Sequence, residues 1–233
     1  MARGADLDAL YLLLQALQDH IDGPRKLANC HGRMDWPDRG VYVFLSNTET
    51  RHASDHPRIT RIGTHAVSAG SSTTLWNRLR THRGAMRGTY EGGGNHRGSV
   101  FRRHVGRAMI DHDGLQDKYP HWGEGSSAGR ERRLEELPLE RRVSDYIRDL
   151  PFLWLEVDDE PGSDSDRASL EKNLIALVSN FQKETIDPRA DDWLGHNSPE
   201  PEIRDSGLWN VDHVAEGYDP ALLDRLYSHI GEG

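Results

Sequence analysis

Cysteine, lysine and long apolar runs are scarce in this sequence of 233 residues. The single cysteine, Cys30, excludes a disulfide within the chain and a zinc site built from cysteines. No apolar run reaches the roughly 18 to 20 residues that a membrane helix needs. The first apolar run, within 6–21, is interrupted by Gln15 and Gln18 and lacks the cleavage site of a signal peptide, so it predicts an amphipathic helix. We therefore expect a protein of the reducing cytoplasm.

Acidic and basic residues are segregated along the chain. Between Arg51 and Arg107 there are eleven arginines and no lysine, against only Asp55 and Glu91, which gives this block a net charge of +9. The whole chain carries −9, so the residues outside the block carry −18. Arginine suits planar, bidentate contact with phosphate. Because lysine is rare throughout the chain, it is the segregation of charge, rather than the absence of lysine, that indicates nucleic acid as a partner.

The hydrophobic pattern predicts an α/β (α+β) fold with a small sheet. The predicted strands are 40–46, 58–65 and 152–157, and the predicted helices are 6–21, 73–83, 99–110, 137–149, 167–181 and 220–230. The first two strands form a hairpin with a long polar tip that ends at Pro57. Residues 184–213 lack periodicity, and a connection of that length is usually functional or tightly packed. We expect Trp193 and Trp209 to hold it against the domain.

These elements divide the chain into three regions. Residues 1–38 contain an N-terminal helix and a connection. Residues 39–183 form the core, with a charged insertion at about 111–150. Residues 184–233 form a C-terminal loop and helix that pack on the core.

Four short motifs follow one another on the predicted elements: "GVY" at 40–42, "RIG" at 61–63, "LWNRLRTH" at 75–82 and "LEKNLIALVSN" at 170–180. Their order on two strands and two helices resembles that of the GIY-YIG nuclease superfamily, in style closest to its restriction-endonuclease-like members. The resemblance spans residues 39–181 and is looser over the insertion. It implies a three-stranded, mainly antiparallel sheet flanked by helices, and a metal-dependent endonuclease that hydrolyses phosphodiester bonds in DNA.

The resemblance assigns roles to three side chains of the first strand and the following helix. Taken alone, Tyr42 in an aliphatic strand is more often a core residue, and Arg78 and His82 are more often solvated. By resemblance, Tyr42 is the general base that acts on the attacking water, a task for which a phenol needs a nearby cation at neutral pH. Arg78 is expected to neutralise the scissile phosphate, and His82 to orient the tyrosine and the phosphate.

Glu171 is the predicted metal ligand. It lies at the margin of the apolar stripe marked by Leu170, Leu174 and Leu177, and a half-buried acid is costly unless it is paired or bound to a cation. A simple interaction with the helix dipole is the structural alternative. By resemblance the cofactor is Mg²⁺ (or Mn²⁺), which a single carboxylate and several waters can hold.

The sequence departs from the family pattern at two positions. The second motif normally carries a tyrosine where this chain has Arg61. The family's late asparagine matches Asn180, nine residues after Glu171 and therefore on the opposite face if the helix continues. Asn180 fits the site only if the helix ends near 179, and Asn197 is the alternative.

The predicted contacts to nucleic acid come from the basic block. They are Arg61, Arg80, Arg83, Arg97, Arg102, Arg103 and Arg107. The basic helix at 99–110 and the glycine-rich loop at 84–98 are expected to hold the DNA backbone independently of sequence. Restriction-type members of the family cut both strands as dimers, so the resemblance raises a homodimer as one arrangement.

Two other classes of function stay open. Arg61 in place of tyrosine is consistent with a nucleic-acid-binding module that has lost cleavage on the same scaffold. The charge of −18 outside the basic block is consistent with an acidic, partner-binding protein.

Overall fold

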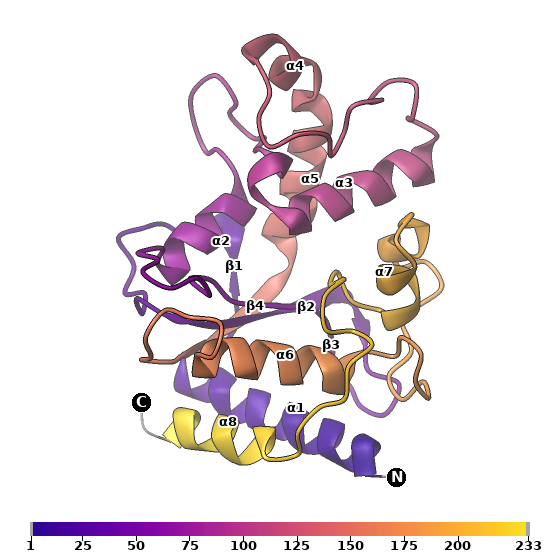
Figure 1. Ribbon diagram of the computed structural model, residues 1–233. Helices are drawn as coiled ribbons and strands as arrows, with labels where there is room; N and C mark the ends of the chain where they lie inside the picture. Colours follow the sequence, from indigo (N-terminus) through magenta and orange to yellow (C-terminus); the bar gives the residue numbers. More distant parts are fainter. Residues whose placement is uncertain (1, 232–233) are drawn as a thin grey trace.

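An antiparallel sheet lies between two layers of helices in the computed structural model, which describes residues 2–231 (Figure 1). Its strands are β1 (Arg25–Lys26), β2 (Gly40–Thr50), β3 (Pro57–Gly63) and β4 (Pro151–Glu156), in the order β1-β4-β2-β3. The three predicted strands are present, and the sheet is antiparallel throughout. The fourth strand, β1, was not predicted because two residues are too few to show a period.

Strand β2 occupies the centre of the sheet and directs different residues to its two faces. Val41, Val43 and Leu45 point to one hydrophobic core, and Tyr42 and Phe44 point to the other. This alternation follows from the two-residue period of a strand. The predicted tyrosine therefore lies on the aromatic side of the sheet.

Eight α-helices lie within residues 2–231. They are α1 (Ala2–His20), α2 (Leu75–Arg83), α3 (Val100–Asp113), α4 (Arg130–Glu135), α5 (Leu137–Asp149), α6 (Asp166–Val178), α7 (Pro201–Ser206) and α8 (Leu222–Gly231). The six predicted helices are present, with ends shifted by a few residues. The two helices that were not predicted, α4 and α7, have six residues each, and α4 buries none of them. Such short helices offer too little periodicity to be recognised in a sequence.

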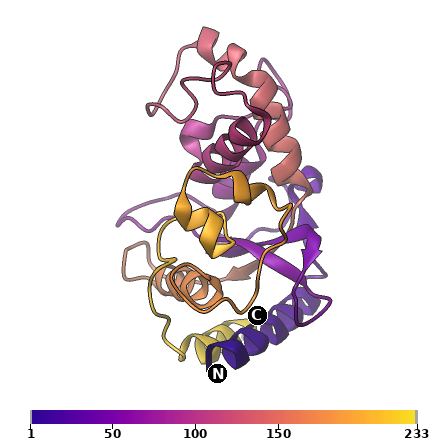
Figure 2. The same ribbon diagram turned by 90° about the vertical axis from the view of Figure 1, so that its right-hand side faces the viewer.

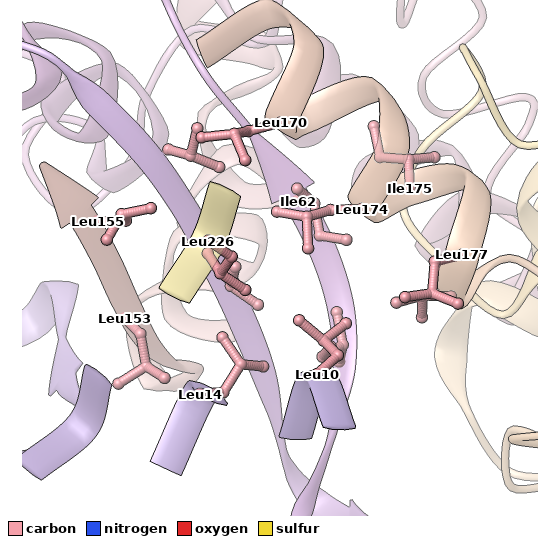
Figure 3. Close-up of a cluster of buried hydrophobic side chains, with 14 of the residues drawn as sticks. Leu10, Leu14, Ile62, Leu153, Leu155, Leu170, Leu174, Ile175, Leu177 and Leu226 are labelled. Atoms are coloured by element: carbon pink, nitrogen blue, oxygen red, sulfur yellow. The ribbon is translucent and has the colours of Figure 1, made fainter. Parts of the chain in front are cut away.

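Helices α1, α6 and α8 cover one face of the sheet (Figures 1 and 2). Their contacts with the sheet form an aliphatic core, the aliphatic face, which includes Leu10 and Leu14 of α1 and Leu153 of β4 (Figure 3). Leu174 and Leu177 of α6 complete it from the same side of the sheet. None of the helices within residues 2–231 is long and apolar enough to cross a membrane.

Helices α2, α3 and α5 cover the other face, which we call the aromatic face. Tyr42, Phe44, Phe101, Phe152 and Trp209 are fully buried there. The Phe44 ring packs against those of Phe101 and Phe152, with centroids 5.4 and 5.3 Å apart. Rings at these separations and inclinations contribute beyond their buried area.

A buried polar network ties α2, α3 and α5 together on the aromatic face. Arg102 forms an ion pair with Glu140 and donates to the backbone oxygen of His82 (2.8 Å) and to Ser144 Oγ (2.9 Å). Glu140 Oε1 also accepts from the backbone N–H of His96 (2.6 Å). Burial raises the pKa of Glu140, but His96 and Arg102 outweigh it and hold that pKa at about 2. The network fixes the charged insertion on the core.

Candidate active site

A cavity of about 280 Å³ opens at the C-terminal end of β3. Strand β3, helices α2, α3 and α6, and the segment that follows α7 all border it. Its polar lining comprises Arg61, Thr64, Arg78, Glu171, Asn210 and His213, with Asp212 at the rim. Two guanidinium groups and one half-buried carboxylate from separate elements thus face one space.

Tyr42 lies behind this cavity and is 0% exposed. It pairs across the sheet with Gly63 of β3, so that the tyrosine of the first motif faces the glycine of the second. A Cβ atom at position 63 would collide with the Tyr42 hydroxyl and ring. The close approach explains why the second motif needs glycine at this position: the phenol ring occupies the space of a side chain.

The Tyr42 hydroxyl is hydrogen-bonded to His82. Tyr42 Oη and His82 Nε2 are 2.9 Å apart, and His82 Nδ1 lies 2.8 Å from Ser99 Oγ. His82 is fully buried, and burial lowers its pKa well below the usual range, an effect to which Arg78 and Arg61 add. The imidazole is therefore neutral at neutral pH.

Ser99 determines which nitrogen of His82 carries the proton. Its hydroxyl oxygen caps α3 by accepting from the backbone N–H of Arg102 (3.2 Å), and the residue is 1% exposed. Within residues 2–231, His82 Nδ1 is the acceptor left for the Ser99 proton. A buried hydroxyl rarely leaves its proton without an acceptor. We therefore assign the imidazole proton to Nε2, which directs it at the Tyr42 oxygen.

Helix α2 presents Arg78 and His82 one turn apart, on the side that faces Tyr42. The helix begins at its cap Thr74, whose hydroxyl accepts from the backbone N–H of Asn77 (3.3 Å), and ends before Gly84 at φ 79°. Interaction with the Tyr42 hydroxyl is the leading factor that raises the pKa of Arg78, and burial opposes it. Arg78 thus remains cationic where it borders the cavity.

Arg61 borders the same cavity from β3. Its Nη1 donates to the backbone oxygen of Trp209, and its guanidinium carbon lies 5.0 Å from the centroid of the Phe101 ring. Burial lowers the pKa of Arg61, and Tyr42 is the largest opposing influence. Arg61 stands where the family pattern has its second tyrosine. It therefore places a buried cation beside Tyr42, the tyrosine of the first motif.

Glu171 reaches the cavity from α6. Its Oε1 accepts from the backbone N–H of Thr64 (3.1 Å), and its other oxygen has no hydrogen-bond partner within residues 2–231. Burial raises the pKa of Glu171, against the opposing effects of Arg61, the Thr64 N–H, His213 and Arg78. A half-buried carboxylate with an open oxygen fits a hard divalent cation that keeps most of its ligands as water.

Asn180 does not join this cavity. Helix α6 ends at Val178, as the assignment of Asn180 to the site requires, but the Asn180 amide donates to the backbone oxygen of Asp187 (2.9 Å) and accepts from the N–H of Ile186 (3.2 Å). Asn197 donates to the backbone oxygen of Leu194 (3.3 Å) and also lies away from the cavity. Both asparagines stabilise loops.

Apart from Arg61, which borders the cavity, the predicted nucleic-acid contacts fall into two groups. The prediction that Arg102 and Arg97 contact nucleic acid was wrong. Arg102 is 0% exposed and paired with Glu140, and the Arg97 guanidinium is buried against Glu136 (2.6 Å). Both guanidinium groups form ion pairs with glutamates of the charged insertion. The sequence around each arginine could not reveal these distant partners. The second group, Arg80, Arg83, Arg103 and Arg107, is exposed or half-buried, although Arg107 pairs with Glu200 (2.7 Å).

The segment 207–213 supplies cavity residues that motif reasoning missed. The Trp209 N–H donates to the oxygen of Thr60 (2.7 Å), and the Asn210 side chain both accepts from the Ile62 N–H (3.2 Å) and donates to the Ile62 oxygen (2.9 Å). The segment thereby lines the free edge of β3 and carries Asn210 and His213 to the cavity. The lack of periodicity over 184–213 was the available signal. Trp193 and Trp209 hold this region in the core, as predicted.

The chain matches a known protein family over its whole length. A family model described as the GIY-YIG domain matches residues 1–233, the whole chain. No curated protein and no solved structure matches the chain.

Proposed function

We propose that this protein is a metal-dependent endonuclease that hydrolyses phosphodiester bonds in DNA. The chain belongs to the GIY-YIG domain family, whose members are generally nucleases. One observation carries the finer part of the proposal. Arg78 of α2 and Glu171 of α6 line one cavity, and the Tyr42–His82 pair is buried behind the arginine. A bond-breaking site for a phosphodiester needs a base, a cation for the phosphate and a metal ligand, and these are the chemical types that meet there.

Tyr42 is the proposed base. In its deprotonated form the phenol oxygen accepts a proton from the attacking water, while the water oxygen bonds to phosphorus and the bond from phosphorus to the leaving oxygen breaks. His82 supports this role because its Nε2 proton, as assigned above, points at the Tyr42 oxygen and holds that oxygen in place by a hydrogen bond. Ser99 holds the imidazole in that tautomer.

Arg78 is the proposed partner of the scissile phosphate. Charge accumulates on the non-bridging oxygens as the water attacks, and a preorganised guanidinium in a partly dry site stabilises it without reorganisation. The half-buried position of Arg78 at the cavity wall supports this assignment.

Glu171 is the proposed ligand of Mg²⁺ or Mn²⁺. When bound, such a cation supplies Lewis-acid stabilisation of charge on the phosphate. Two observations support this role. One oxygen of Glu171 has no hydrogen-bond partner within residues 2–231, and the effect of burial on the carboxylate exceeds that of the positive groups around it. Glu171 is the proposed protein ligand, and water would fill the other positions, because no group of three or more His, Cys, Asp or Glu side chains suited to a metal occurs in residues 2–231.

Arg80, Arg83, Arg103 and Arg107 are the proposed contacts to the DNA backbone. They belong to α2 and α3, the helices that border the cavity. Phosphate contacts of this kind hold a duplex without reading its sequence and weaken as salt rises.

A second candidate, a module that binds nucleic acid without cutting it, is favoured by the burial of Tyr42. A phenol that is 0% exposed reaches a water molecule only if the Arg61 and Arg78 side chains leave a path to it.

Plasmid nicking in the presence of Mg²⁺ separates the two candidates. Tyr42→Phe, Arg78→Ala and Glu171→Ala are compared with matched changes at exposed residues, Tyr227→Phe, Arg33→Ala and Glu160→Ala. We expect the first three to lose cleavage and the controls to keep it. Undiminished cleavage in all three would overturn the site assignment. Binding without cleavage in the unmodified protein supports the second candidate, and the absence of both activities rejects both.

A further inference from the structure

Arg61 differs from every other buried arginine among residues 2–231. The buried arginines are Arg51, Arg58, Arg61, Arg102 and Arg167. Four of them have a carboxylate within ion-pair distance: Arg51 with Asp8 (2.9 Å), Arg58 with Glu49 (3.0 Å), Arg102 with Glu140 (2.5 Å) and Arg167 with Asp159. Arg61 has none in the described part of the chain. A buried charge without a counter-ion is strongly unfavourable.

The surroundings of Arg61 leave most of its donors without an acceptor. Apart from the neighbouring Tyr42 hydroxyl, its acceptor within residues 2–231 is the backbone oxygen of Trp209, and its Nε has no partner at all. A guanidinium carries five N–H donors. His104 of α3 also faces Arg61, but burial lowers its pKa to about 3, so it is neutral and offers no negative charge.

The charged groups around the cavity indicate which kind of ligand would supply the negative charge and hydrogen-bond acceptors that Arg61 lacks. Arg78 faces it from α2, and Glu171 faces it from α6 without coming within ion-pair distance. Asp212 lies at the exposed rim. Two guanidinium groups at one cavity form a setting for a tetrahedral oxyanion, because its oxygens can accept charge-assisted hydrogen bonds from both of them.

We propose that Arg61 is a second phosphate-binding group of the site and that, together with Arg78, it holds the non-bridging oxygens of a phosphodiester. Arg61 stands where the family pattern has a tyrosine, so the second motif of this chain contributes a cation where a phenol is expected. This inference rests on the proposed function, because it assigns a role within the same cavity. Its test therefore begins with a ligand that requires no cleavage.

Inorganic phosphate is the probe. The full chain is titrated with phosphate by calorimetry at constant ionic strength without metal, and the same titration is made on Arg61→Met, Arg61→Lys and Arg61→Tyr. Arg33→Met, at an exposed arginine, is the matched control. We expect phosphate affinity to fall about 10- to 100-fold in Arg61→Met and Arg61→Tyr, the effect of losing a charge-assisted hydrogen bond. Arg61→Lys, which keeps the charge, should fall less, and Arg33→Met should be unchanged.

Circular dichroism and thermal unfolding of each variant distinguish this role from a merely structural one. Arg61 also holds the Trp209 backbone, so Arg61→Met could fail to fold. Arg61→Tyr introduces the residue of the family pattern, and Arg61→Lys retains a hydrogen-bond donor. We expect these two variants to fold, so the test can be made on either one if Arg61→Met unfolds. A folded variant without the guanidinium that binds phosphate as the unmodified protein does would overturn the proposal.

DNA cleavage then separates this inference from the proposed function. If Arg61-dependent phosphate binding is found in a protein that does not cut DNA, the role of Arg61 stands and the nuclease proposal fails. If the protein cuts DNA but Arg61→Tyr retains both phosphate affinity and KM, the nuclease proposal stands and the role of Arg61 is rejected.

Discussion

The two faces of the sheet are built from different chemistry. The aliphatic face, under α1, α6 and α8, is made mainly of Leu, Ile and Val side chains. The aromatic face, under α2, α3 and α5, combines rings with the Tyr42–His82–Ser99 chain and the Arg102–Glu140 pair. Apolar contacts are tolerant of small shifts, whereas hydrogen bonds require fixed distances and angles. The aliphatic face therefore depends mainly on apolar packing, whereas the aromatic face also holds the candidate catalytic groups in fixed positions.

Glu171 is the exception that joins the two faces, since it belongs to a helix of the aliphatic face and ends in the cavity. Glu171→Gln should have the largest effect. Cleavage should fall at least about a hundredfold, since several kcal/mol of stabilisation come from a metal at such a site. Binding of Mn²⁺ measured by calorimetry should be lost as well.

The same variant should unfold at a higher temperature than the unmodified protein at neutral pH. Burial raises the pKa of Glu171 in the folded protein above its pKa in the unfolded chain. The ionised carboxylate therefore opposes folding at every pH above the unfolded-chain pKa, and an uncharged amide removes this penalty. Differential scanning calorimetry checks it. A lower melting temperature would show that the charge is compensated within the protein.

Leu10→Ala tests the aliphatic face. Leu10 is fully buried in the aliphatic core, and we expect a loss of about 2–5 kcal/mol in the free energy of unfolding. The kcat of the folded fraction should not change, because no hydrogen bond of the site depends on Leu10. Urea unfolding and cleavage rates below the transition supply the two readouts. A change in kcat without a change in stability would contradict the division between the faces.

Glu140→Gln tests the polar network of the aromatic face through pH. The pKa of Glu140 is held at about 2, below its ordinary value of 4.5, so its ionised form stabilises the fold above pH 4.5 and this contribution is lost as pH falls toward 2. We expect the unmodified protein to lose stability across that range and Glu140→Gln to be less stable at neutral pH and less sensitive to acid. Denaturant midpoints between pH 2 and pH 7 measure both. Parallel curves for the two proteins would rule out this role.

Ser99→Ala should have the smallest effect. It removes the group that fixes the His82 tautomer, and we expect cleavage to fall about tenfold, equivalent to about 1.4 kcal/mol. The variant also loses the cap of α3, which costs about 1 kcal/mol of stability. A pH profile of cleavage separates the two consequences, because loss of the cap alone leaves its shape unchanged.

The sequence was sufficient where a signal lies within one element. The central strand, its hairpin partner and the six longer helices follow from apolar periods, and Tyr42, Arg78, His82 and Glu171 follow from motifs carried by those elements. The roles of these residues stay predictions. What periodicity cannot supply is the partner of a charged or polar side chain.

Arg102 and Asn210 show why. Arg102 lies in a basic helix and looked available to DNA, yet its counter-ion is 38 residues away in the insertion. Asn210 lies in a segment without periodicity and pairs with a backbone 148 residues earlier. Such pairings depend on how elements meet in space, which one sequence does not encode in any local pattern.

The docking of residues 209–213 along β3 has a consequence for biosynthesis. The hairpin, α2 and α6 can assemble while the chain is still growing, since domains tend to fold from the N-terminus as they emerge. The cavity wall formed by Asn210 and His213 cannot exist until that late segment has left the ribosome. A nascent chain that ends before this segment therefore carries an incomplete cavity, and any cutting activity that depends on the cavity would begin only after residues 209–213 have emerged.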